Sequence, residues 1–371
     1  MIVRDEEAFL GDCLKSIAGE VDEIVIVDTG SVDRTREIAR DHGARVFEHP
    51  WSGDFAAARN RALDHAGGDW ILYIDADERL SVPEPGALRA VVAGGADVVA
   101  FQVLFQPQVN YTPYRELRLF RRDDRIRFRG VIHESVHPDL ERVARNDGLT
   151  FALSDIGLVH VGYEGDLTHK HRRNLPLLEE AVRVTPERVF LWADMARALA
   201  GLGRRGEAEE ACWRAIGVAD ASDDAKQEAD AAPAWECLVG LHLEGDAAHA
   251  AALARRATAA LPEHLGLRLI LANALFATGE AEPILPLLEG LVAIDAETFQ
   301  DALVAYDRRI FGEWPYDLLG AVHARMGRRE EAALAFAQAS KAAPDNLAYR
   351  VKAAALSGRG APPDSRKPLV G

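Results

Sequence analysis

The sequence predicts an α/β domain followed by an all-α domain of helical repeats. Its 371 residues exceed the roughly 250–300 at which one hydrophobic core stops growing. Up to about residue 165, short apolar runs alternate with helical patterns, which is typical of strand–helix–strand units and a parallel sheet. From about residue 170 the apolar period becomes that of a helix and β-branched runs disappear. We therefore expect domains over 1–168 and 169–360, with a flexible tail over 361–371.

The strands and helices of the first half can be placed in order. A buried strand is expected over 24–27, and Ser31 or Asp33 can cap a helix that Gly43 stops. A second helix is expected over 56–65, closed by the two glycines after it. The further strands are expected over 44–47, 70–74, 97–105, 116–120 and 157–161.

Three features of the first half stand apart from this pattern. Only about three residues precede the charged run that begins at Arg4, so the first strand is expected to be shorter than the usual five or six residues. The segment 106–115, rich in proline and tyrosine, is expected to form a loop over a site. Seven arginines lie within 115–129, which fits a solvated face and an anion-binding surface equally well.

Composition and charge restrict the class of protein. The 43 Lys and Arg against 59 Asp and Glu give a formal charge of −16, which argues against nucleic-acid binding. Cys13, Cys212 and Cys237 lack the spacing of zinc or redox sites, so we interpret them as reduced thiols. No apolar run approaches the roughly 18–20 residues of a membrane helix. We expect a cytoplasmic protein without a membrane span, with peripheral contact at the inner face of the cell membrane as an option.

The second half repeats around four glycines. When Gly203, Gly245, Gly279 and Gly327 are aligned, small or apolar residues recur seven and eight positions before and five and twelve after them. This pattern resembles the tetratricopeptide repeat, a helical hairpin of about 34 residues with small residues at its packing positions. The spacing is irregular, and the Asp/Ala-rich stretch 219–232 is expected to be an exposed loop. Such repeats imply binding of an acceptor or protein partner, or a homodimer.

Two aspartates follow a predicted buried strand. Asp75 and Asp77 come directly after the strand 70–74, so a period of two would aim both carboxylates the same way. Open α/β sheets bind ligands at this end of their strands. Carboxylate oxygens together with a nucleotide diphosphate suit Mg²⁺ or Mn²⁺. Acidic residues after a strand are common, so this pair alone is only suggestive.

Three ordered motifs strengthen that interpretation. They are Glu-Ile-Val-Ile-Val-Asp-Thr-Gly-Ser at 23–31, Ala-Ala-Arg-Asn at 57–60 and Gly-Asp-Trp-Ile-Leu-Tyr-Ile-Asp-Ala-Asp at 68–77. In this order they resemble family 2 glycosyltransferases over roughly residues 1–165. The nearest likeness is to bacterial enzymes that carry tetratricopeptide repeats, including the lipopolysaccharide-core glucosyltransferase-like group, which Ile-His-Glu at 132–134, His-Val-Gly-Tyr at 160–163 and Arg-Arg-Asn-Leu at 172–175 also resemble. The resemblance implies a GT-A nucleotide-sugar-binding domain followed by a tetratricopeptide-like domain.

The resemblance also implies roles for individual residues. The nucleotide-sugar contacts are expected from Asp28 at the base, Glu6 near the ribose or base, Asp75 at the ribose or sugar, and Arg59 at the phosphates or base. Asp77 would hold the divalent cation that bridges the two phosphates, and His160 would complete its coordination or contact the leaving group. A helix-surface ion pair for Arg59 and a packed, hydrogen-bonded role for His160 are the alternatives. Lys170, with the histidines on either side of it, forms a basic cluster that is either solvated or in contact with the diphosphate.

The implied reaction needs a base. Family 2 enzymes invert the anomeric centre in one displacement, so a group must take the proton of the acceptor, and Glu134 is the candidate. Its alternative is a structural pair with a nearby arginine. We expect a metal-dependent, inverting transferase that moves a sugar from a nucleotide sugar to a glycan, lipid-linked or peptide acceptor. A nucleotide-sugar-binding repeat scaffold without turnover is the second hypothesis. A nucleotidyltransferase is disfavoured because no Gly-rich phosphate loop occurs near the N-terminus.

Overall fold

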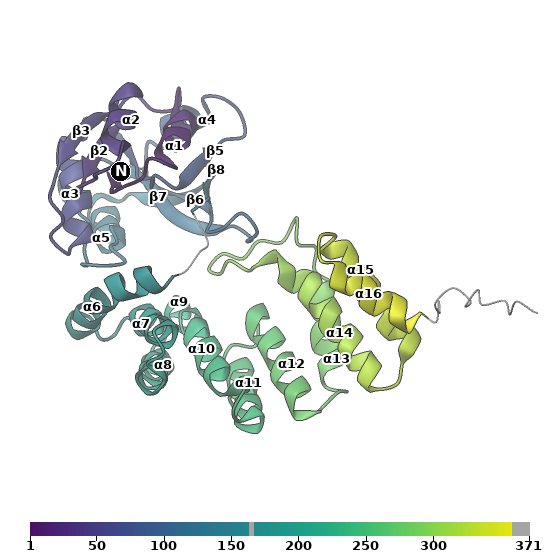
Figure 1. Ribbon diagram of the computed structural model, residues 1–371. Coiled ribbons are helices and arrows are strands. Elements are labelled where there is room, and N and C mark those ends of the chain that lie inside the picture. Colours follow the sequence, from purple (N-terminus) through teal and green to yellow (C-terminus); the bar gives the residue numbers. More distant parts are fainter. Residues whose placement is uncertain (163–166, 358–371) are drawn as a thin grey trace, which may run out of the picture. The chain divides into compact units, whose positions relative to one another are not determined.

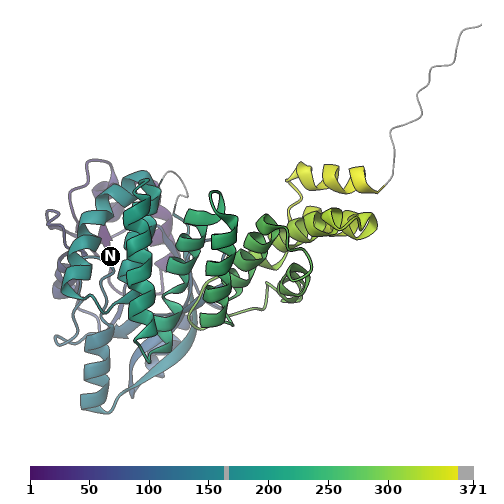
Figure 2. The same cartoon turned by 90° about the horizontal axis from the view of Figure 1, so that it is seen from below.

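The computed structural model describes residues 1–162 and 167–357. The chain divides into two compact units, one of Met1–Cys237 with Gln300–Ala305 and one of Leu238–Phe299 with Tyr306–Gly371. Figures 1 and 2 show strands and helices in the first part of the chain and helices in the rest. The expected tail over 361–371 and Tyr163 of the predicted motif lie outside the described residues.

The first sheet is parallel and short. Its order is β1 (Ile2–Val3), β2 (Val25–Asp28) and β3 (Arg45–Glu48), and Val3 pairs with Asp28. Helices α1 (Leu10–Ile17) and α2 (Thr35–Asp41) connect these strands. Asp33 accepts hydrogen bonds from the backbone and hydroxyl of Thr35, which supports the start of α2 much as expected. The two residues of β1 confirm the expectation of a short first strand.

The second sheet is mixed. Its order is β4-β7-β6-β8-β5. The strands are β4 (Trp70–Leu72), β5 (Glu78–Ser81), β6 (Val98–Gln106), β7 (Tyr114–Arg121) and β8 (Thr150–His160). Three further helices of the domain are α3 (Phe55–His65), α4 (Ala87–Ala93) and α5 (His137–Asp147).

The expectation of a wholly parallel sheet is wrong for this second sheet. Strands β6 and β7 are antiparallel, because the connection over 107–113 is too short for a crossover. Strand β8 is parallel to β6, since α5 lies in the connection between β7 and β8. Strand β5 has no counterpart among the predicted strands, and it pairs with the end of β8. The first helices and strands thus follow the predicted order, and the sheet connections differ.

The remaining helices of the first unit follow β8. They are α6 (Thr168–Val184), α7 (Val189–Gly201), α8 (Arg205–Asp220) and α9 (Ala225–Ala229), and α10 (Ala232–Leu243) crosses into the second unit. The second unit continues with α11 (Ala247–Ala260), α12 (Leu265–Thr278), α13 (Ile284–Val292), η1 (Arg308–Phe311), α14 (Glu313–Arg325), α15 (Arg329–Ala342) and α16 (Leu347–Leu356). Consecutive helices pack on one another within each unit.

The four aligned glycines lie in the turns of four helical hairpins. Gly203, Gly279 and Gly327 have positive φ angles of 78°, 88° and 76°, which glycine adopts without strain. Gly245 lies between α10 and α11. A Cβ on Gly320 would lie 2.7 Å from the ring of Phe336, so this small residue permits the close packing of α14 on α15. The fold class expected from the sequence, an α/β domain followed by tetratricopeptide-like helices, is confirmed.

Two smaller expectations need correction. The stretch 219–232 is not simply a loop, because it contains α9 and the buried Ala231 and Ala232. The loop over 107–113 contributes no lining residue to the cleft described below. In the part of the chain that the structure describes, no helix has both the length and the apolar character to cross a membrane.

Candidate active site

A cleft of about 630 Å³ opens beside the ends of β1 and β4. It collects nearly all the predicted site residues, although they come from distant parts of the chain. Those that line it are Glu6, Arg59, Asp75, Asp77, Glu134 and His160. Further walls come from the loop before α3, from Leu167 directly before α6, and from Lys170, Arg173 and Asn174 of α6. The cleft therefore involves the first helix of the helical half.

Arg59 joins two acidic residues of the cleft. Its guanidinium donates to both carboxylate oxygens of Asp75, at 2.9 and 3.0 Å, and its Nε donates to Glu134. The guanidinium also lies over the rings of Tyr73 and Phe128, with 5.3 and 5.6 Å to the centroids. Arg59 and Glu134 are only 11% and 10% exposed, so this pairing is not the surface ion pair considered for Arg59.

The ion pair with Arg59 keeps Asp75 ionised. Burial alone would raise the pKa of Asp75, but the charge and hydrogen bonds of Arg59 outweigh it and lower the pKa to about 2. The backbone N–H of Asp75 in turn donates to Glu78 at 2.9 Å. Asp75 is thus fixed on both its side chain and its backbone.

Asp77 pairs with His160 at the wall of the cleft. The Nε2 of His160 lies 2.9 Å from a carboxylate oxygen of Asp77, and the backbone N–H of Val161 donates to the carbonyl of Asp77 at 2.8 Å. The hydrogen bond to Asp77 raises the pKa of His160. A Cβ on Gly162 would lie 2.6 Å from the imidazole and 2.9 Å from the Asp77 carboxylate, so only glycine leaves the pair in place.

These two side chains fit the chemistry of a divalent cation. A carboxylate and an imidazole suit Mn²⁺, and Mg²⁺ is commonly held by one or two carboxylates together with substrate phosphates and water. The two side chains are about one third exposed, at 30% and 33%, so a ligand can reach them. Among residues 1–162 and 167–357 no group of three or more His, Cys, Asp and Glu side chains could hold a metal. The remaining ligands would have to come from water and a bound nucleotide.

Glu6 lies near the two aspartates of the cleft, Asp75 and Asp77. Its backbone N–H donates to the hydroxyl of Thr35 at 2.7 Å, which fixes the loop after β1. Burial, with the negative charges of Asp77 and Asp75, raises the pKa of Glu6 to about 7. The carboxylates of this cleft therefore repel one another, and a cation would relieve that repulsion.

Asp28 lies at the end of β2 but does not line the cleft. It is 2% exposed, and its Oδ1 accepts hydrogen bonds from the backbone N–H groups of Gly30 and Ser31, both at 3.1 Å. Gly30 has a φ of 117° within this turn. The neighbouring Thr29 is the residue of this loop that lines the cleft. The carboxylate thus shapes a turn rather than facing a ligand directly.

A buried ion pair beneath the aspartates was not predicted. Arg118 on β7 contacts Glu78 at 3.0 Å, with side chains only 7% and 2% exposed. Arg118 also lies over the ring of Tyr73, at 4.5 Å from its centroid. Because Glu78 accepts the backbone N–H of Asp75, this pair supports the turn that carries both cleft aspartates. The one available signal was that Glu78 directly follows Asp77 in the sequence.

The seven arginines of the run all make hydrogen bonds or ion pairs within the α/β domain. One of them, Arg118, also lines the cleft, and the anion-binding interpretation of the run stays a prediction. The partners of the seven are Ser154 for Arg115, Glu78 for Arg118, Val98 for Arg121, Gly68 for Arg122, Asp147 for Arg125, Asp64 for Arg127 and Asp139 for Arg129. The cleft's exposed cations come from Arg4, Lys170 and Arg173.

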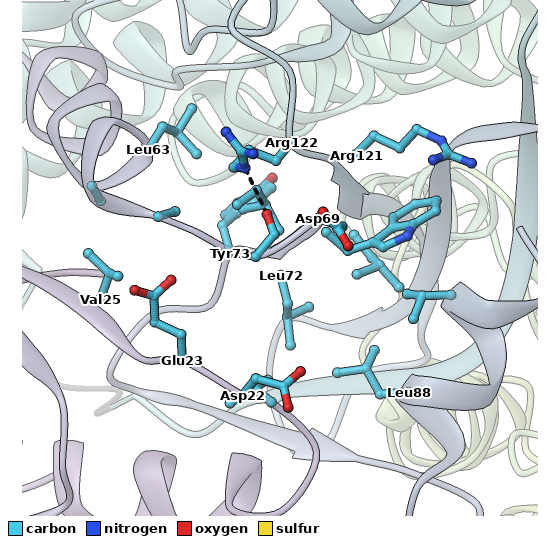
Figure 3. Close-up of a pocket in the computed structure, with 18 of the residues that line it drawn as sticks. Asp22, Glu23, Val25, Leu63, Asp69, Leu72, Tyr73, Leu88, Arg121 and Arg122 are labelled. Atoms are coloured by element: carbon cyan, nitrogen blue, oxygen red, sulfur yellow. Dashed lines mark hydrogen bonds between the residues drawn. The ribbon is translucent and has the colours of Figure 1, made fainter. Parts of the chain in front are cut away.

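A second cavity, of about 710 Å³, lies among β2, β4, α3 and α4. Figure 3 shows acidic Asp22, Glu23 and Asp69 and basic Arg121 and Arg122 around it, and Arg122 donates to the carbonyl of Gly68 at 2.9 Å. It is larger than the cleft, but Arg59 is its only lining residue among the predicted site residues. The smaller cleft is the candidate active site because it brings together the predicted residues Glu6, Asp75, Asp77 and Glu134.

The fold and the cleft together define an α/β domain with acidic and basic groups converging at strand ends, followed by helical hairpins. Residues 1–140 match the family described as Glycosyl transferase family 2. This match confirms, for the N-terminal domain, the resemblance drawn from the motifs.

Three curated relatives are similar to part of this chain. A TPR repeat-containing protein of Synechococcus elongatus is 45% identical over 142 residues, which are 38% of this chain and 35% of the relative. The SPbeta prophage-derived glycosyltransferase SunS of Bacillus subtilis is 30% identical over 197 residues, covering 50% of this chain and 45% of SunS. The lipopolysaccharide core biosynthesis glycosyltransferase LpsC of Rhizobium meliloti is 33% identical over 153 residues, covering 38% of this chain and 56% of LpsC. In these matches the chain spans between about a third and just over half of each relative's length.

Proposed function

We propose that this protein is a metal-dependent glycosyltransferase that moves a sugar from a nucleotide-sugar donor to an acceptor, with inversion at the anomeric carbon. The observation that carries the proposal is the convergence of Arg59, Asp75, Asp77, Glu134 and His160 in one cleft. The family match over residues 1–140 and the two glycosyltransferases among the relatives support it.

The cleft is lined by both acidic and basic side chains. Asp77 and His160 would hold Mg²⁺ or Mn²⁺, and such a cation stabilises the negative charge that develops on a departing diphosphate. Lys170 and Arg173 of α6 line the same cleft and supply positive charge toward that diphosphate. Glu6 and Asp75 line the same cleft and would accept hydrogen bonds from ribose or sugar hydroxyls. Asp28 acts through the turn that it organises and thereby places Thr29 at the cleft wall.

Glu134 is proposed to act at the acceptor. Its carboxylate takes the proton of an acceptor hydroxyl or thiol as that oxygen or sulfur bonds to the anomeric carbon, while the bond from this carbon to the diphosphate oxygen breaks. The electron pair of that bond leaves with the nucleoside diphosphate. Arg59 orients Glu134 through its Nε, so it is a positioning residue for the base as well as the partner of Asp75.

The helical region is proposed to bind the acceptor or a protein partner, or to form a homodimer. The acceptor class stays open among a glycan, a lipid-linked glycan and a peptide side chain. We propose domain boundaries at 1–168 and 169–360, and the change from the last strand, β8, to the helices that begin with α6 supports them. The three free cysteines support action in the cytoplasm.

One observation favours a second function. Glu134 is engaged with Arg59, and a base committed to an ion pair must give up part of that interaction to accept a proton. A domain that binds nucleotide sugar and presents the repeats without turnover would have the same arrangement. Donor binding without release of nucleoside diphosphate would favour this scaffold.

A donor panel tests the proposed function. The protein is incubated with Mn²⁺ or Mg²⁺ and a set of UDP- and GDP-sugars, and released nucleoside diphosphate is measured together with the thermal unfolding midpoint. We expect release with one donor class that requires the cation and is lost in Asp77→Ala, whose fold is retained. Stabilisation by a donor without any release, including after addition of acceptor fractions, would contradict the proposal and support the scaffold.

A further inference from the structure

In the loop that carries Glu134, the preceding residue, His133, has an unusual backbone conformation. His133 has a φ of 51°, in the left-handed region that a non-glycine residue enters only at an energetic cost. The loop is closed by a pair of backbone hydrogen bonds between Arg129 and Ser135, both 3.0 Å, and Gly130 has a φ of 102°. Some contact must therefore hold His133 in this conformation.

The contact comes from the helical region. The Nε2 of His133 lies 2.7 Å from Oδ2 of Asp194 on α7, and the imidazole meets the ring of Phe190 edge-on at 5.4 Å between centroids. Asp194 is 17% exposed and is also paired with Arg197 one turn later on α7. Burial alone would raise the pKa of Asp194, but His133 and Arg197 outweigh it and lower the pKa to about 2. The carboxylate is thus a fixed anion facing the loop.

The two neighbouring side chains of the loop have different partners. His133 binds Asp194 on α7, whereas Glu134 accepts a hydrogen bond from Arg59 in the cleft. Just before this loop, the side-chain amide of Asn60 on α3 exchanges two hydrogen bonds with the backbone of Phe128, at 2.8 and 2.9 Å. A short backbone segment is therefore held by the α/β domain at one side and by α7 at the other.

We propose that Asp194 is a positioning residue for sugar transfer: through His133 it holds the backbone that places Glu134 at the acceptor. This inference rests on the proposed function, because it assigns α7 a part in the same reaction. The helical region then contributes to the rate of transfer and does not serve only to recruit partners. Asp75 and Asp77 lie on the segment between β4 and β5, so we expect donor binding to change little when this contact is lost.

The first test measures the loop itself and needs no substrate. Hydrogen exchange is followed in the peptide that spans 129–136, in the full-length protein and in Asp194→Ala. We expect exchange in this peptide to become at least about tenfold faster, since opening of a loop follows its local free energy. The exposed Asp220→Asn on α8 is the matched control and leaves exchange unchanged. Unchanged exchange in Asp194→Ala with an unchanged thermal midpoint overturns the proposal.

The second test connects the loop to catalysis. In Asp194→Ala, kcat for the donor found in the panel should fall about tenfold while KM and the Kd for UDP or GDP with Mn²⁺ stay within about twofold. Combining it with His133→Ala should add no further loss, because one residue acts through the other. The proposal is overturned if the losses in kcat are additive in the double variant, or if Asp194→Ala raises the Kd for UDP or GDP. If the wild-type protein turns over no donor, the proposed function fails, and the exchange experiment still decides the contact.

Discussion

Arg59 holds Asp75 through two parallel hydrogen bonds of 2.9 and 3.0 Å and uses its remaining Nε for Glu134. One guanidinium thus fixes a residue proposed for the donor and a residue proposed for the acceptor. Only arginine offers donors in a planar fork that can meet two carboxylates at once. The distance between the donor and acceptor ends of the cleft is therefore set by a single side chain on α3.

Replacing this side chain should destabilise the fold as well as the site. Arg59→Met leaves the largely buried Glu134 and the partly buried Asp75 without their partner, which costs about 3 kcal/mol in the free energy of unfolding. Urea denaturation measures this loss. The exposed Arg61→Met on the same helix is the control, expected within about 0.5 kcal/mol of wild type. Equal denaturation midpoints for Arg59→Met and wild type would show that the ion pairs contribute nothing.

Much of the site could be predicted because its residues lie in short motifs. Asp75 and Asp77 belong to a local sequence pattern at the end of a strand, and Arg59 belongs to one in the helix before that strand. Such patterns determine backbone geometry directly. Glu134 and His160 were expected only from resemblance, and the fold brings both to the same cleft.

Other features depended on contacts that no local pattern carries. The pairs His133–Asp194 and Arg118–Glu78 join residues far apart in the sequence, and nothing in either neighbourhood indicates its partner. Asp28 was expected to face the ligand, but its carboxylate satisfies backbone N–H groups of its own turn. The arginine run was ambiguous because composition does not reveal whether an acidic residue or a carbonyl lies opposite.

A side chain at position 162 should disturb Asp77 and His160, the two residues proposed to hold the cation. In Gly162→Ala the new Cβ would lie within 3 Å of both His160 and Asp77, so the pair must move apart. We expect the Mn²⁺ concentration for half-maximal release of nucleoside diphosphate to rise about tenfold, since disturbing a metal ligand's orientation typically costs this much.

Gly206→Ala on α8 is the matched control for this change. A Cβ there meets nothing within 4 Å, and alanine favours a helix, so metal dependence should stay as in wild type. If Gly162→Ala titrates with Mn²⁺ as wild type does, the pair of Asp77 and His160 does not hold the cation.

Glu6 should make the free energy of unfolding of the metal-free protein depend on pH. Its pKa is about 7 in the folded protein, raised from 4.5 by burial and by Asp77 and Asp75. The folded state therefore retains a proton that the unfolded state loses, so the contribution of Glu6 to stability is present below about pH 4.5 and is lost as the pH rises through about 7.

Glu6→Gln removes this loss. Measured by urea denaturation in EDTA, the free energy of unfolding of the variant relative to wild type should increase between about pH 5 and about pH 7 and then level off. The exposed Glu84→Gln should show no such trend. A difference that stays constant across this range would show that Glu6 titrates as an ordinary carboxyl group.

The most direct test of the proposed sugar transfer is the Glu134→Gln variant. Glutamine keeps an oxygen that can accept the hydrogen bond from Arg59, but it cannot take the acceptor's proton. We expect the Kd for UDP or GDP with Mn²⁺ to stay within about twofold, while sugar transfer falls by about 10²–10⁴-fold, the usual contribution of a positioned base. Transfer by Glu134→Gln within a few-fold of wild type would contradict the assignment of the base and, with it, the proposed chemistry of this cleft.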